Sequence, residues 1–289
     1  MKMIDELLRR PASWLSGENE EGELVMSSRV RLARNIEGRP FTHRAAPGEL
    51  SAARSAVRRA ANGAPSLSGA LAFDLDDSPE PDRMLLAERR LVSLEMVRNH
   101  AGRSLVVDQD ESLSVMINEE DHLRLQAVGS GLSLRQAAER IGRLDDELDE
   151  RLPYAWSERL GYLTACTTNV GTGMRASAMV HLPGLVRNKD IAAVLDGLSH
   201  VRLTVRGAYG EGTQATGNFF QVSNSITLGV SEEETIRNLE SHVRKLLEFE
   251  RKAREVLLRK ARSLLEDSIW RAAGILRTAR VLTSKEAMS

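Results

Sequence analysis

Three acids, a histidine and an arginine stand together in NEEDHLR, residues 118–124, directly after the apolar run SLSVMI. If the flanking segments are paired strands, the acids lie on the connecting turn and Arg124 points toward the same region. A carboxylate there can hold a guanidinium or an ammonium group, or help to hold Mg²⁺ through water. A charged, exposed turn would have the same composition, and this segment by itself does not separate the two interpretations.

The segment SSRVR, residues 27–31, places side chains of one chemical kind on one side of a predicted strand. Ser27, Arg29 and Arg31 alternate, so their side chains share a face. Guanidinium groups match phosphate oxygens in a bidentate manner, which makes this face a candidate phosphate clamp. The chain has 34 arginines against 6 lysines, however, so an arginine-rich, solvated strand face is the alternative.

The only cysteine of the chain, Cys166, lies in TACTTNVGTGMRAS, residues 164–177. A lone cysteine forms no disulfide within the chain, so it is either an inert buried residue or a functional thiolate. We expect it at a strand end, followed by two glycines that permit close backbone approach and by Arg175, and nearby arginines can lower a thiol pKa. A glycine-rich connection beside a buried cysteine is the alternative.

A second glycine-rich segment, RGAYGEGTQATGN, spans residues 206–218 and contains Arg206 and Glu211. Its composition suits a mobile loop that closes over a ligand. A long hairpin loop without a function would have the same composition.

Together these segments supply an inventory suited to phosphoryl transfer: cations for the phosphates, with Mg²⁺, and groups that orient a nucleophile. The P-loop pattern and the protein-kinase signatures are both missing from the sequence, so nucleotide chemistry would run on another scaffold. The candidate groups are Arg29, Arg31, Arg124, Arg175, Arg206, Glu120, Glu211 and Cys166.

The composition is that of a globular protein of one large or two modest domains, with 289 residues, 42% hydrophobic and 28% charged. The 40 basic and 41 acidic residues nearly cancel, which gives no global field toward nucleic acid or membrane. The sequence shows neither an 18-residue apolar run nor a signal peptide, so we expect a cytoplasmic protein.

The elements that must position these residues follow from the hydrophobic periodicity. We expect strands over ELVMSSRVRLARNI and GALAFDLDD, then three strands joined by DQDE and NEED, and later strands over YLTACTT, HVRLTVRGAYG and NFFQVSNSITLG. Helices are predicted over 47–62, LRQAAERIGRLDDELDERL, MVHLPGLV and IAAVLDGL, and PDRMLLAERRLVS is predicted as a helix that runs into a loop. A further long helix is predicted from a capping box at Ser231 and Glu234 to about Trp270. This order predicts an α+β fold with a mostly antiparallel sheet flanked by helices.

Four segments occur in a fixed order along the chain: SSRVRLARN, SVMINEEDHLR, GYLTACTTNVGTGMRAS and VRGAYGEGTQATGNFFQVSN. They resemble the signatures of the phosphagen (ATP:guanido) kinase family, most closely its bacterial protein-arginine kinases. The resemblance implies the glutamine-synthetase-like catalytic domain over residues 22–253, preceded by an N-terminal helical extension, 1–21. Residues 254–289 would be a helical tail, with the C-terminal domain of the family absent.

The resemblance also implies roles for individual residues. Glu120 would be the principal acid that orients the guanidinium and takes its proton, Glu211 its partner from the loop, Cys166 a thiolate beside the guanidinium, and Asp121 a support of the hairpin. No residue is assigned to a metal. The ATP site would be lined by Ser27, Ser28, Arg29, Val30, Arg31, Arg124, Arg175, Ala176, Ser177, Ala178, Met179, Arg206, Gly207, Ala208, Tyr209, Gly210 and Glu211.

Two positions depart from the family pattern. The usual CPTN reads CTTN here, so Thr167 lacks the rigidity of a proline beside the thiol. A histidine that contacts the nucleotide is replaced near Arg90, where an arginine can bind phosphate but stacks differently.

The implied activity is transfer of the γ-phosphate of ATP, with Mg²⁺, to arginine residues of proteins. The family also implies a protease-chaperone or activator partner. Two other functions stay open at this point: a kinase for a small free guanidino compound, and a nucleotide-binding pseudoenzyme that regulates a partner. Intact Glu120, Glu211 and Cys166 argue against the pseudoenzyme.

Overall fold

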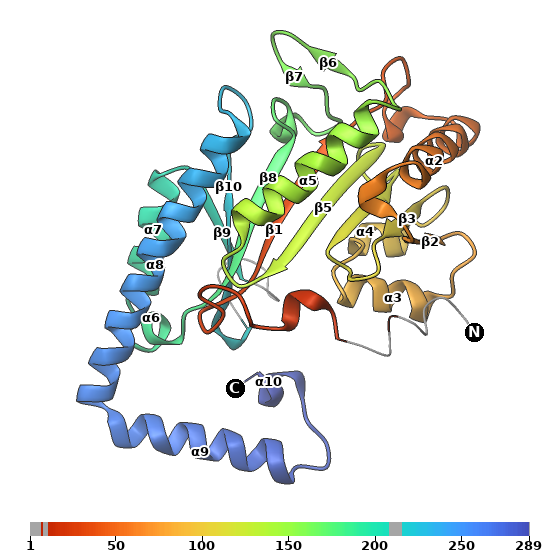
Figure 1. Cartoon of the computed structure of the whole chain (residues 1–289). Helices are drawn as coiled ribbons and strands as arrows, with labels where there is room; N and C mark the ends of the chain where they lie inside the picture. Colours follow the sequence, from red (N-terminus) through yellow and green to blue (C-terminus); the bar gives the residue numbers. More distant parts are fainter. Residues whose placement is uncertain (1–6, 8–10, 208–215, 289) are drawn as a thin grey trace.

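The structure is a computed structural model that describes residue 7, residues 11–207 and residues 216–288. Its centre is one eight-stranded antiparallel sheet with the strand order β2-β3-β4-β5-β1-β8-β10-β9 (Figure 1). The α+β class with an antiparallel sheet is therefore confirmed. The strands are β1 (Val25–Arg34), β2 (Leu71–Asp74), β3 (Ser104–Val107), β4 (Leu113–Ile117), β5 (Leu123–Ser130), β8 (Met174–His181), β9 (Leu203–Gly207) and β10 (Phe219–Asn224); β6 (Trp156–Ser157) and β7 (Gly161–Tyr162) form a separate hairpin.

Helices connect the strands and cover the sheet unevenly. The α-helices are α2 (Pro47–Asn62), α3 (Glu80–Glu88), α4 (Leu94–Arg98), α5 (Leu134–Asp149), α6 (Pro183–Arg187), α7 (Ile191–His200), α8 (Glu232–Lys260), α9 (Arg262–Thr278) and α10 (Ser284–Ala287). Short 3₁₀ turns are η1 (Ser13–Leu15), η2 (Thr42–Arg44), η3 (Pro65–Leu67), η4 (Thr167–Asn169) and η5 (Thr216–Asn218). None of the described helices is long and apolar enough to cross a membrane.

The first face of the sheet carries the main core beneath α5 and α8, which lie in front of the sheet in Figure 1. Val30 and Leu32 of β1 meet Ile141 and Leu144 of α5 and Leu246 of α8 in one cluster of buried side chains. Burial of each such side chain contributes about 1.5–3 kcal/mol, so this cluster fixes which face of β1 points inward.

The second face of the sheet is covered differently along its length. Over β2, β3 and β4, a smaller apolar cluster packs on it, in which Leu105, Val107 and Met116 meet Leu86 of α3 and Met96 of α4. Over β1 and β8, this face carries arginine side chains instead. Since guanidinium groups are costly to bury without partners, this stretch is where a ligand site is expected.

The predicted hairpins are confirmed, because β3, β4 and β5 pair consecutively through the DQDE and NEED turns. The capping bond that opens α8 is also present, with Ser231 Oγ accepting from the Glu234 backbone N–H at 3.0 Å. The capping contact explains why the sequence placed the start of this helix correctly.

Three predicted elements are wrong. YLTACTT is not a strand: only Tyr162 belongs to β7, and the chain then turns through η4. The predicted helix over MVHLPGLV is a strand, β8, up to His181, followed by the short α6. The long helix breaks at Ala261, whose backbone angles of φ −141° and ψ 33° end α8, so α8 and α9 are two helices. The predicted N-terminal extension, residues 1–21, lies partly outside the described residues, and its described part includes Leu7 in helical backbone and η1.

Candidate active site

Strand β1 supplies the first cations of the site by simple alternation. Arg29 and Arg31 point to the second face of the sheet, whereas Val30 and Leu32 are fully buried in the core on the first face. Because successive side chains of a strand alternate, the buried pair forces both guanidinium groups to the same side.

Strand register then brings the other cations beside them. Arg31 lies opposite Arg175 on β8. Arg124 of β5 lies opposite Ala33, which is the next residue of β1 on the same face as Arg31. On the outer strands, Gln221 of β10 lies opposite Arg206 of β9. The Gln221 Oε1 atom accepts a hydrogen bond of 3.1 Å from Arg29 Nη2. Groups separated by up to 192 residues along the chain thus share one face.

This arrangement concentrates positive charge with little compensation. Burial, and then the charges of Arg90 and Arg124, lower the pKa of Arg29 to about 10. Burial, and then the charges of Arg29, Arg124 and Arg175, lower the pKa of Arg31 well below its usual range, with Glu119 acting in the opposite direction. A group of mutually repelling guanidinium ions is stabilised by a bound polyanion, which neutralises them together.

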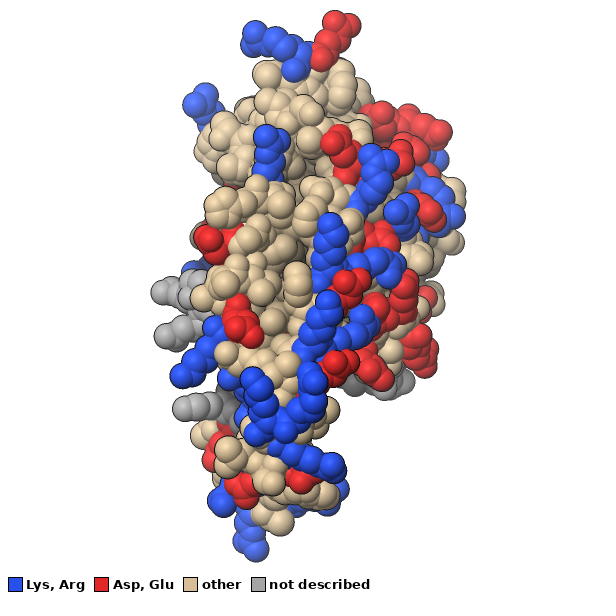
Figure 2. Space-filling view, turned by 90° about the vertical axis from the view of Figure 1, so that its left-hand side faces the viewer, with Lys and Arg blue, Asp and Glu red and all other residues tan. Residues whose placement is uncertain are grey.

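The positive charge of this face is not matched by the whole chain, whose formal net charge is −1. On the side along α8, Figure 2 shows a band of basic side chains that runs beside acidic ones. The site thus suits a small polyanion held at one place rather than an extended one spread over the surface.

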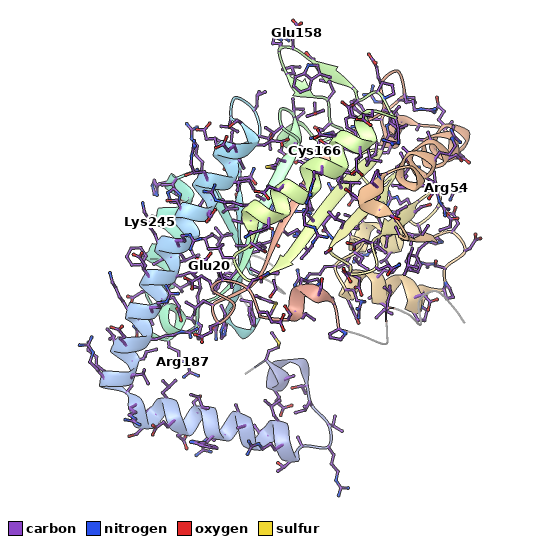
Figure 3. The ribbon with its side chains drawn as sticks, in the orientation of Figure 1. Glu20, Arg54, Glu158, Cys166, Arg187 and Lys245 are labelled. Carbon is purple, nitrogen blue, oxygen red and sulfur yellow. The ribbon has the colours of Figure 1, made fainter. Side chains whose placement is uncertain are left out.

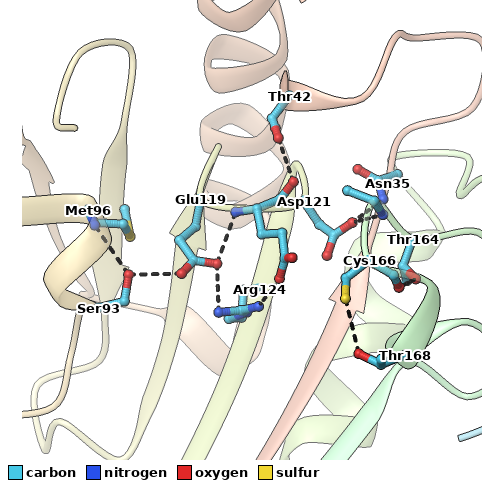
Figure 4. Close-up of polar contacts among 12 residues, drawn as sticks. Asn35, Thr42, Ser93, Met96, Glu119, Asp121, Arg124, Thr164, Cys166 and Thr168 are labelled. Atoms are coloured by element: carbon cyan, nitrogen blue, oxygen red, sulfur yellow. Dashed lines mark hydrogen bonds and ion pairs between the residues drawn. The ribbon is translucent and has the colours of Figure 1, made fainter. Parts of the chain in front are cut away.

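The turn between β4 and β5 presents the acids (Figure 4). Glu119 is buried and is held by Ser93 Oγ at 2.8 Å and by Arg124 Nη1 at 2.6 Å. The next carboxylate, Glu120, is 44% exposed in its side chain and pairs with Arg124 Nη2 at 2.9 Å. Thr42 fixes the turn from the other side by donating to the Glu120 carbonyl oxygen. One acid therefore anchors Arg124, and the other remains accessible to a ligand.

Asp121 connects the turn to the cysteine. It is fully buried, and its Oδ1 atom accepts hydrogen bonds of 2.6 Å from both Asn35 Nδ2 and the Ala165 backbone N–H. Burial raises the pKa of Asp121 despite these two donors. Ala165 precedes Cys166, so Asp121 sets the backbone position from which the thiol projects.

The thiol itself is half-buried and has one polar neighbour. Cys166 Sγ lies 3.0 Å from Thr168 Oγ1, and the Cys166 carbonyl oxygen accepts from Thr164 Oγ1 at 2.7 Å. In Figure 3, Cys166 lies between the half of the molecule that carries Arg54 and the half that carries Lys245. Cys166 is also close enough to Arg175 for their charges to interact. A thiolate here would face a cation on one side and an open cavity on the other.

His122, also in the NEEDHLR segment, has a structural role. Its Nδ1 atom accepts from the Ile36 backbone N–H at 3.1 Å, which leaves Nε2 to donate to the Pro40 carbonyl oxygen at 3.1 Å. Both ring nitrogens are thereby used, and burial lowers the pKa of His122. The imidazole ties the turn to the chain after β1 and has no free nitrogen for proton transfer.

A cavity of about 230 Å³ unites these groups. Arg31, Arg124, Arg175 and Arg206 line it together with Glu120, Cys166, Thr168, Asn169, Gln221 and Ser223. Four guanidinium groups, one accessible carboxylate and one thiol thus surround a single space. Of the other candidate groups from the sequence, Arg29 does not line this cavity, and Glu211 lies outside the described residues.

The expected runs on β1 and β8 divide between the two faces of the sheet. Ser27, Ser177 and Met179 share the face of the arginines, because Ser177 pairs with Arg29 and Met179 pairs with Ser27, but none of the three lines the cavity. Ser28, Val30, Ala176 and Ala178 instead point into the core, and their side chains line no part of the cavity. The Ser28 hydroxyl is occupied by the Gly131 carbonyl oxygen and the Ser133 backbone N–H. The alternation of a strand explains the division.

The remaining expected residues are placed as follows. Arg90 lies close enough to Arg29 to affect its pKa, and its guanidinium lies 5.9 Å from the centre of the Trp14 ring. Thr167 is exposed and begins η4. Gly207 ends β9. Ala208, Tyr209, Gly210 and Glu211 lie outside the described residues.

Sequence reasoning missed three residues that shape the site. Asn35 bridges Asp121 and the Leu163 carbonyl oxygen, Glu119 anchors Arg124, and Gln221 holds Arg29. For Glu119 the sequence did contain a signal, because this residue stands beside Glu120 on the charged turn. Asn35 and Gln221 act across sheet register, which no local pattern contains.

Comparison with known proteins places the chain in a family. Residues 54–253 match the family model of the ATP:guanido phosphotransferase C-terminal catalytic domain. A protein-arginine kinase of Clostridium novyi (strain NT) is 43% identical over 279 residues, which cover 96% of this chain and 81% of the relative. A protein-arginine kinase of Pelotomaculum thermopropionicum is 46% identical over 278 residues, covering 95% of this chain and 78% of the relative.

Solved structures agree with this placement. The crystal structure of a lombricine kinase superposes with a TM-score of 0.72 at 27% identity, over 83% of this chain and 70% of that one. The duplicated taurocyamine kinase of Schistosoma mansoni, with bound transition-state analogue components, gives 0.70 at 26% identity over 86% of this chain and 38% of that one. The fold and the site define a phosphotransferase that acts on guanidino groups. This chain belongs to the ATP:guanido phosphotransferase family.

Proposed function

We propose that this chain is a protein-arginine kinase, which transfers the γ-phosphate of ATP to the guanidino group of arginine residues in proteins. The observation that carries the proposal is the cavity in which four arginines face Glu120 and Cys166. Relatives that carry the name protein-arginine kinase are 43% and 46% identical over nearly the whole chain.

The nucleotide end of the site is assigned to the arginines. Arg29 and Arg31 of β1, with Arg124, Arg175 and Arg206, would bind the triphosphate by charge-assisted, bidentate hydrogen bonds. Their crowding in the free protein supports this assignment, because binding of a polyanion relieves the mutual repulsion. Fixed cations around the transferring phosphoryl group also stabilise the charge that develops there.

The acceptor end is assigned to the acid and the thiol. A protonated guanidinium is a poor nucleophile, and its pKa exceeds 12. Glu120 and Cys166 would align it with the γ-phosphorus. A guanidino nitrogen then forms the new P–N bond, the bond from phosphorus to the ADP oxygen breaks, and the proton passes from the nitrogen to the Glu120 carboxylate. Glu211 is proposed, from the sequence alone, to assist from the loop.

The ion pair between Glu120 and Arg124 would couple the nucleotide end of the site to the acceptor end. In the free protein Arg124 is held by two carboxylates, Glu119 and Glu120. A nucleotide phosphate that attracts Arg124 would weaken its bond to the exposed carboxylate. Glu120 would then become free to receive the guanidinium of the substrate, while the buried Glu119 keeps Arg124 in place.

Mg²⁺ is proposed as the metal that accompanies ATP, where it would neutralise charge on the phosphates. The described residues contain no group of three or more His, Cys, Asp or Glu side chains suited to a metal. An ion that keeps several waters and binds mainly through substrate phosphates needs no such group. A protease-chaperone or activator partner and a cytoplasmic location also remain proposals, which rest on the sequence resemblance.

The test is phosphoryl transfer from radiolabelled ATP to an arginine-rich unfolded protein, with free L-arginine in parallel and acid lability of the product as the readout. Acid-labile label on the protein, lost in Glu120→Gln, is the expected result. Label only on free arginine would favour a small-substrate kinase. ATP binding without label on either acceptor would favour a nucleotide-binding regulator.

A matched pair of variants tests the nucleotide end separately. Arg31→Gln removes one cation from the cavity, whereas Arg143→Gln removes an exposed arginine on α5. We expect ATP affinity, measured by calorimetry, to fall about tenfold or more for the first and to stay within about twofold for the second. Equal affinities for the two variants would contradict the assignment of the sheet face to ATP.

A further inference from the structure

A second, larger cavity of about 840 Å³ adjoins the site. Its walls come from η2, the start of α2, the segment from α4 to β3, and the turn between β4 and β5. Asn118 holds two of these walls together, since its Nδ2 atom donates to the carbonyl oxygens of Leu50 at 2.8 Å and Gly102 at 2.9 Å. The cavity is thus a built part of the fold rather than a gap between loose segments.

The two cavities meet at the reacting groups. Glu120 lines both of them, Ala165 lines the larger one, and the next residue, Cys166, lines the smaller one. A guanidinium group bound between Glu120 and Cys166 therefore has the nucleotide site on one side and the large cavity on the other. Whatever is attached to that guanidinium has the large cavity directly beside it.

The size of this cavity exceeds the need of a free amino acid. Pockets for whole drug-sized ligands span about 300–1,000 Å³. A volume of about 840 Å³ lies near the upper end of this range. It offers room for several residues of an extended polypeptide.

The charges of the cavity wall indicate what kind of polypeptide fits. Arg98 and Arg103 line it, and within the described residues neither forms an ion pair with a carboxylate. Arg103 donates to the Glu95 carbonyl oxygen at 3.0 Å and has further donors available. Glu95, Glu119 and Glu120 line the cavity as well, and the charges of Glu119 and Glu95 act on Arg103. Glu119 is paired with Arg124, and Glu120 faces the target guanidinium in the proposed complex. Against the remaining carboxylate, Glu95, the two guanidinium groups of Arg98 and Arg103 leave one net positive charge on this wall.

We propose that the large cavity binds the polypeptide on either side of the target arginine, and that Arg98 and Arg103 select targets with acidic residues close to that arginine. This inference rests on the proposed protein-arginine kinase function and deepens it. Complementary charge near the site would favour acidic flanks, since each pair is gained only when the correct peptide is bound.

The experiment uses three peptides that each contain one arginine and differ only in the flanking residues: aspartate, asparagine or lysine. We measure kcat/KM of each with the wild type, the double variant Arg98→Glu/Arg103→Glu and the matched control Arg143→Glu. Within each protein, we express the result as two ratios of kcat/KM: aspartate-flanked to asparagine-flanked peptide, and aspartate-flanked to lysine-flanked peptide. A ratio taken within one protein is independent of the fraction of that protein that is active.

The wild type and the control should prefer the aspartate-flanked over the asparagine-flanked peptide about three- to tenfold, through a lower KM at similar kcat. The double variant should reverse the order and prefer the lysine-flanked peptide. If Arg103→Glu disturbs the wall through its bond to Glu95, the single variant Arg98→Glu at the exposed position keeps the test, with a smaller change in the same direction.

Two outcomes would overturn the inference while the proposed function stands: equal kcat/KM for all three peptides, or a preference for acidic flanks that persists unchanged in Arg98→Glu/Arg103→Glu. Absence of phosphorylation on every peptide and on free arginine would instead refute the proposed function. The two failures are therefore distinguishable in one set of assays.

Discussion

Asp121 offers the sharpest test of how the fold positions the thiol. Its Oδ1 atom accepts from Asn35 Nδ2 and from the Ala165 N–H, both at 2.6 Å, and the residue is fully buried. Asp121→Ala removes the acceptor and leaves two buried donors without this partner. Each unsatisfied buried group costs about 1–3 kcal/mol. Asn35 keeps its bond to the Leu163 carbonyl oxygen, so we expect a loss of about 2–4 kcal/mol of unfolding free energy.

Asp121→Asn is the informative companion variant. An asparagine Oδ1 atom can accept both hydrogen bonds, so the backbone at Ala165 stays in place. The charge is lost, and an NH₂ group takes the buried position of Oδ2, which has no hydrogen-bond partner among the described residues. We expect this variant to lose about 1–2 kcal/mol of unfolding free energy, less than Asp121→Ala, and to retain most of its kcat. For Asp121→Ala we expect kcat to fall about a hundredfold, because a misplacement of about 1 Å at a reacting group has that effect.

Three measurements on each variant decide the matter: urea unfolding, kcat for phosphorylation of an arginine-containing protein, and the rate of Cys166 alkylation by iodoacetamide. If Asp121 positions the thiol, Asp121→Ala changes all three, whereas Asp121→Asn loses only part of the stability and keeps kcat and the alkylation rate close to those of the wild type. An equal loss of kcat in both variants, with Asp121→Asn the more stable of the two, would refute the positioning argument and assign the charge of Asp121 a direct part in the reaction.

Three further predictions concern stability, pH and nucleotide affinity. Asp145→Asn should lower the unfolding free energy, measured in urea, by about 2–4 kcal/mol, because Asp145 pairs at 2.6 Å with the Arg34 guanidinium, which is 1% exposed. The control is Asp146→Asn at an exposed position of the same helix. It should change the unfolding free energy by less than about 0.5 kcal/mol. Burial lowers the pKa of His122 in the folded protein. The neutral imidazole therefore contributes fully to stability above the unfolded-state pKa of about 6.5. This contribution is lost as pH falls through the lower pKa of the folded state. Unfolding free energies at pH 7.5 and 5.5 should therefore differ less in His122→Gln than in the wild type, and an equal difference would contradict the neutral imidazole. Glu120→Gln should bind ATP at least as tightly as the wild type, and up to about fivefold more tightly in calorimetry, because the substitution releases Arg124 from its ion pair. Weaker binding would contradict competition between the Glu120 carboxylate and the phosphates for Arg124.

The stability prediction for Asp145 also illustrates how the two faces of the sheet differ. Arg34 ends β1 and is fully buried, with its guanidinium 3.4 Å from the centre of the Tyr162 ring and bonded to the carbonyl oxygens of Ala33 and Thr172. Its charge is compensated by Asp145 and, at 3.4 Å, by Glu232, unlike that of Arg31 on the other face. An arginine with two carboxylates and two carbonyl partners stabilises the fold, whereas an arginine beside other arginines indicates a ligand.

Local patterns were sufficient where the controlling interactions are local. Alternation on β1 predicted that Arg29 and Arg31 share a face, and the polar NEED turn between apolar runs predicted the hairpin that presents Glu120. The capping contact of Ser231 predicted the start of α8. In each case the signal and its physical cause lie within a few residues of each other.

The same patterns failed where packing overrides local preference. MVH reads as apolar helix, yet Val180 is fully buried in β8 because two neighbouring strands pair with it. The break between α8 and α9 at Ala261 has no glycine or proline to announce it. Cys166 follows a strand of two residues and precedes a 3₁₀ turn, so its position depends on Asp121, 45 residues earlier, rather than on a strand end.

The sequence by itself determined the chemical inventory of this protein: which cations, acids and thiol are available, and in which segments they lie. Only the tertiary structure decided which of them meet. Register across β5, β1, β8, β10 and β9 gathers the arginines, and Asp121 and Asn35 fix the cysteine across from Glu120. The physical reason is that strand pairing and buried hydrogen bonds join residues far apart in the chain, and no periodicity within one segment records the identity of its partner.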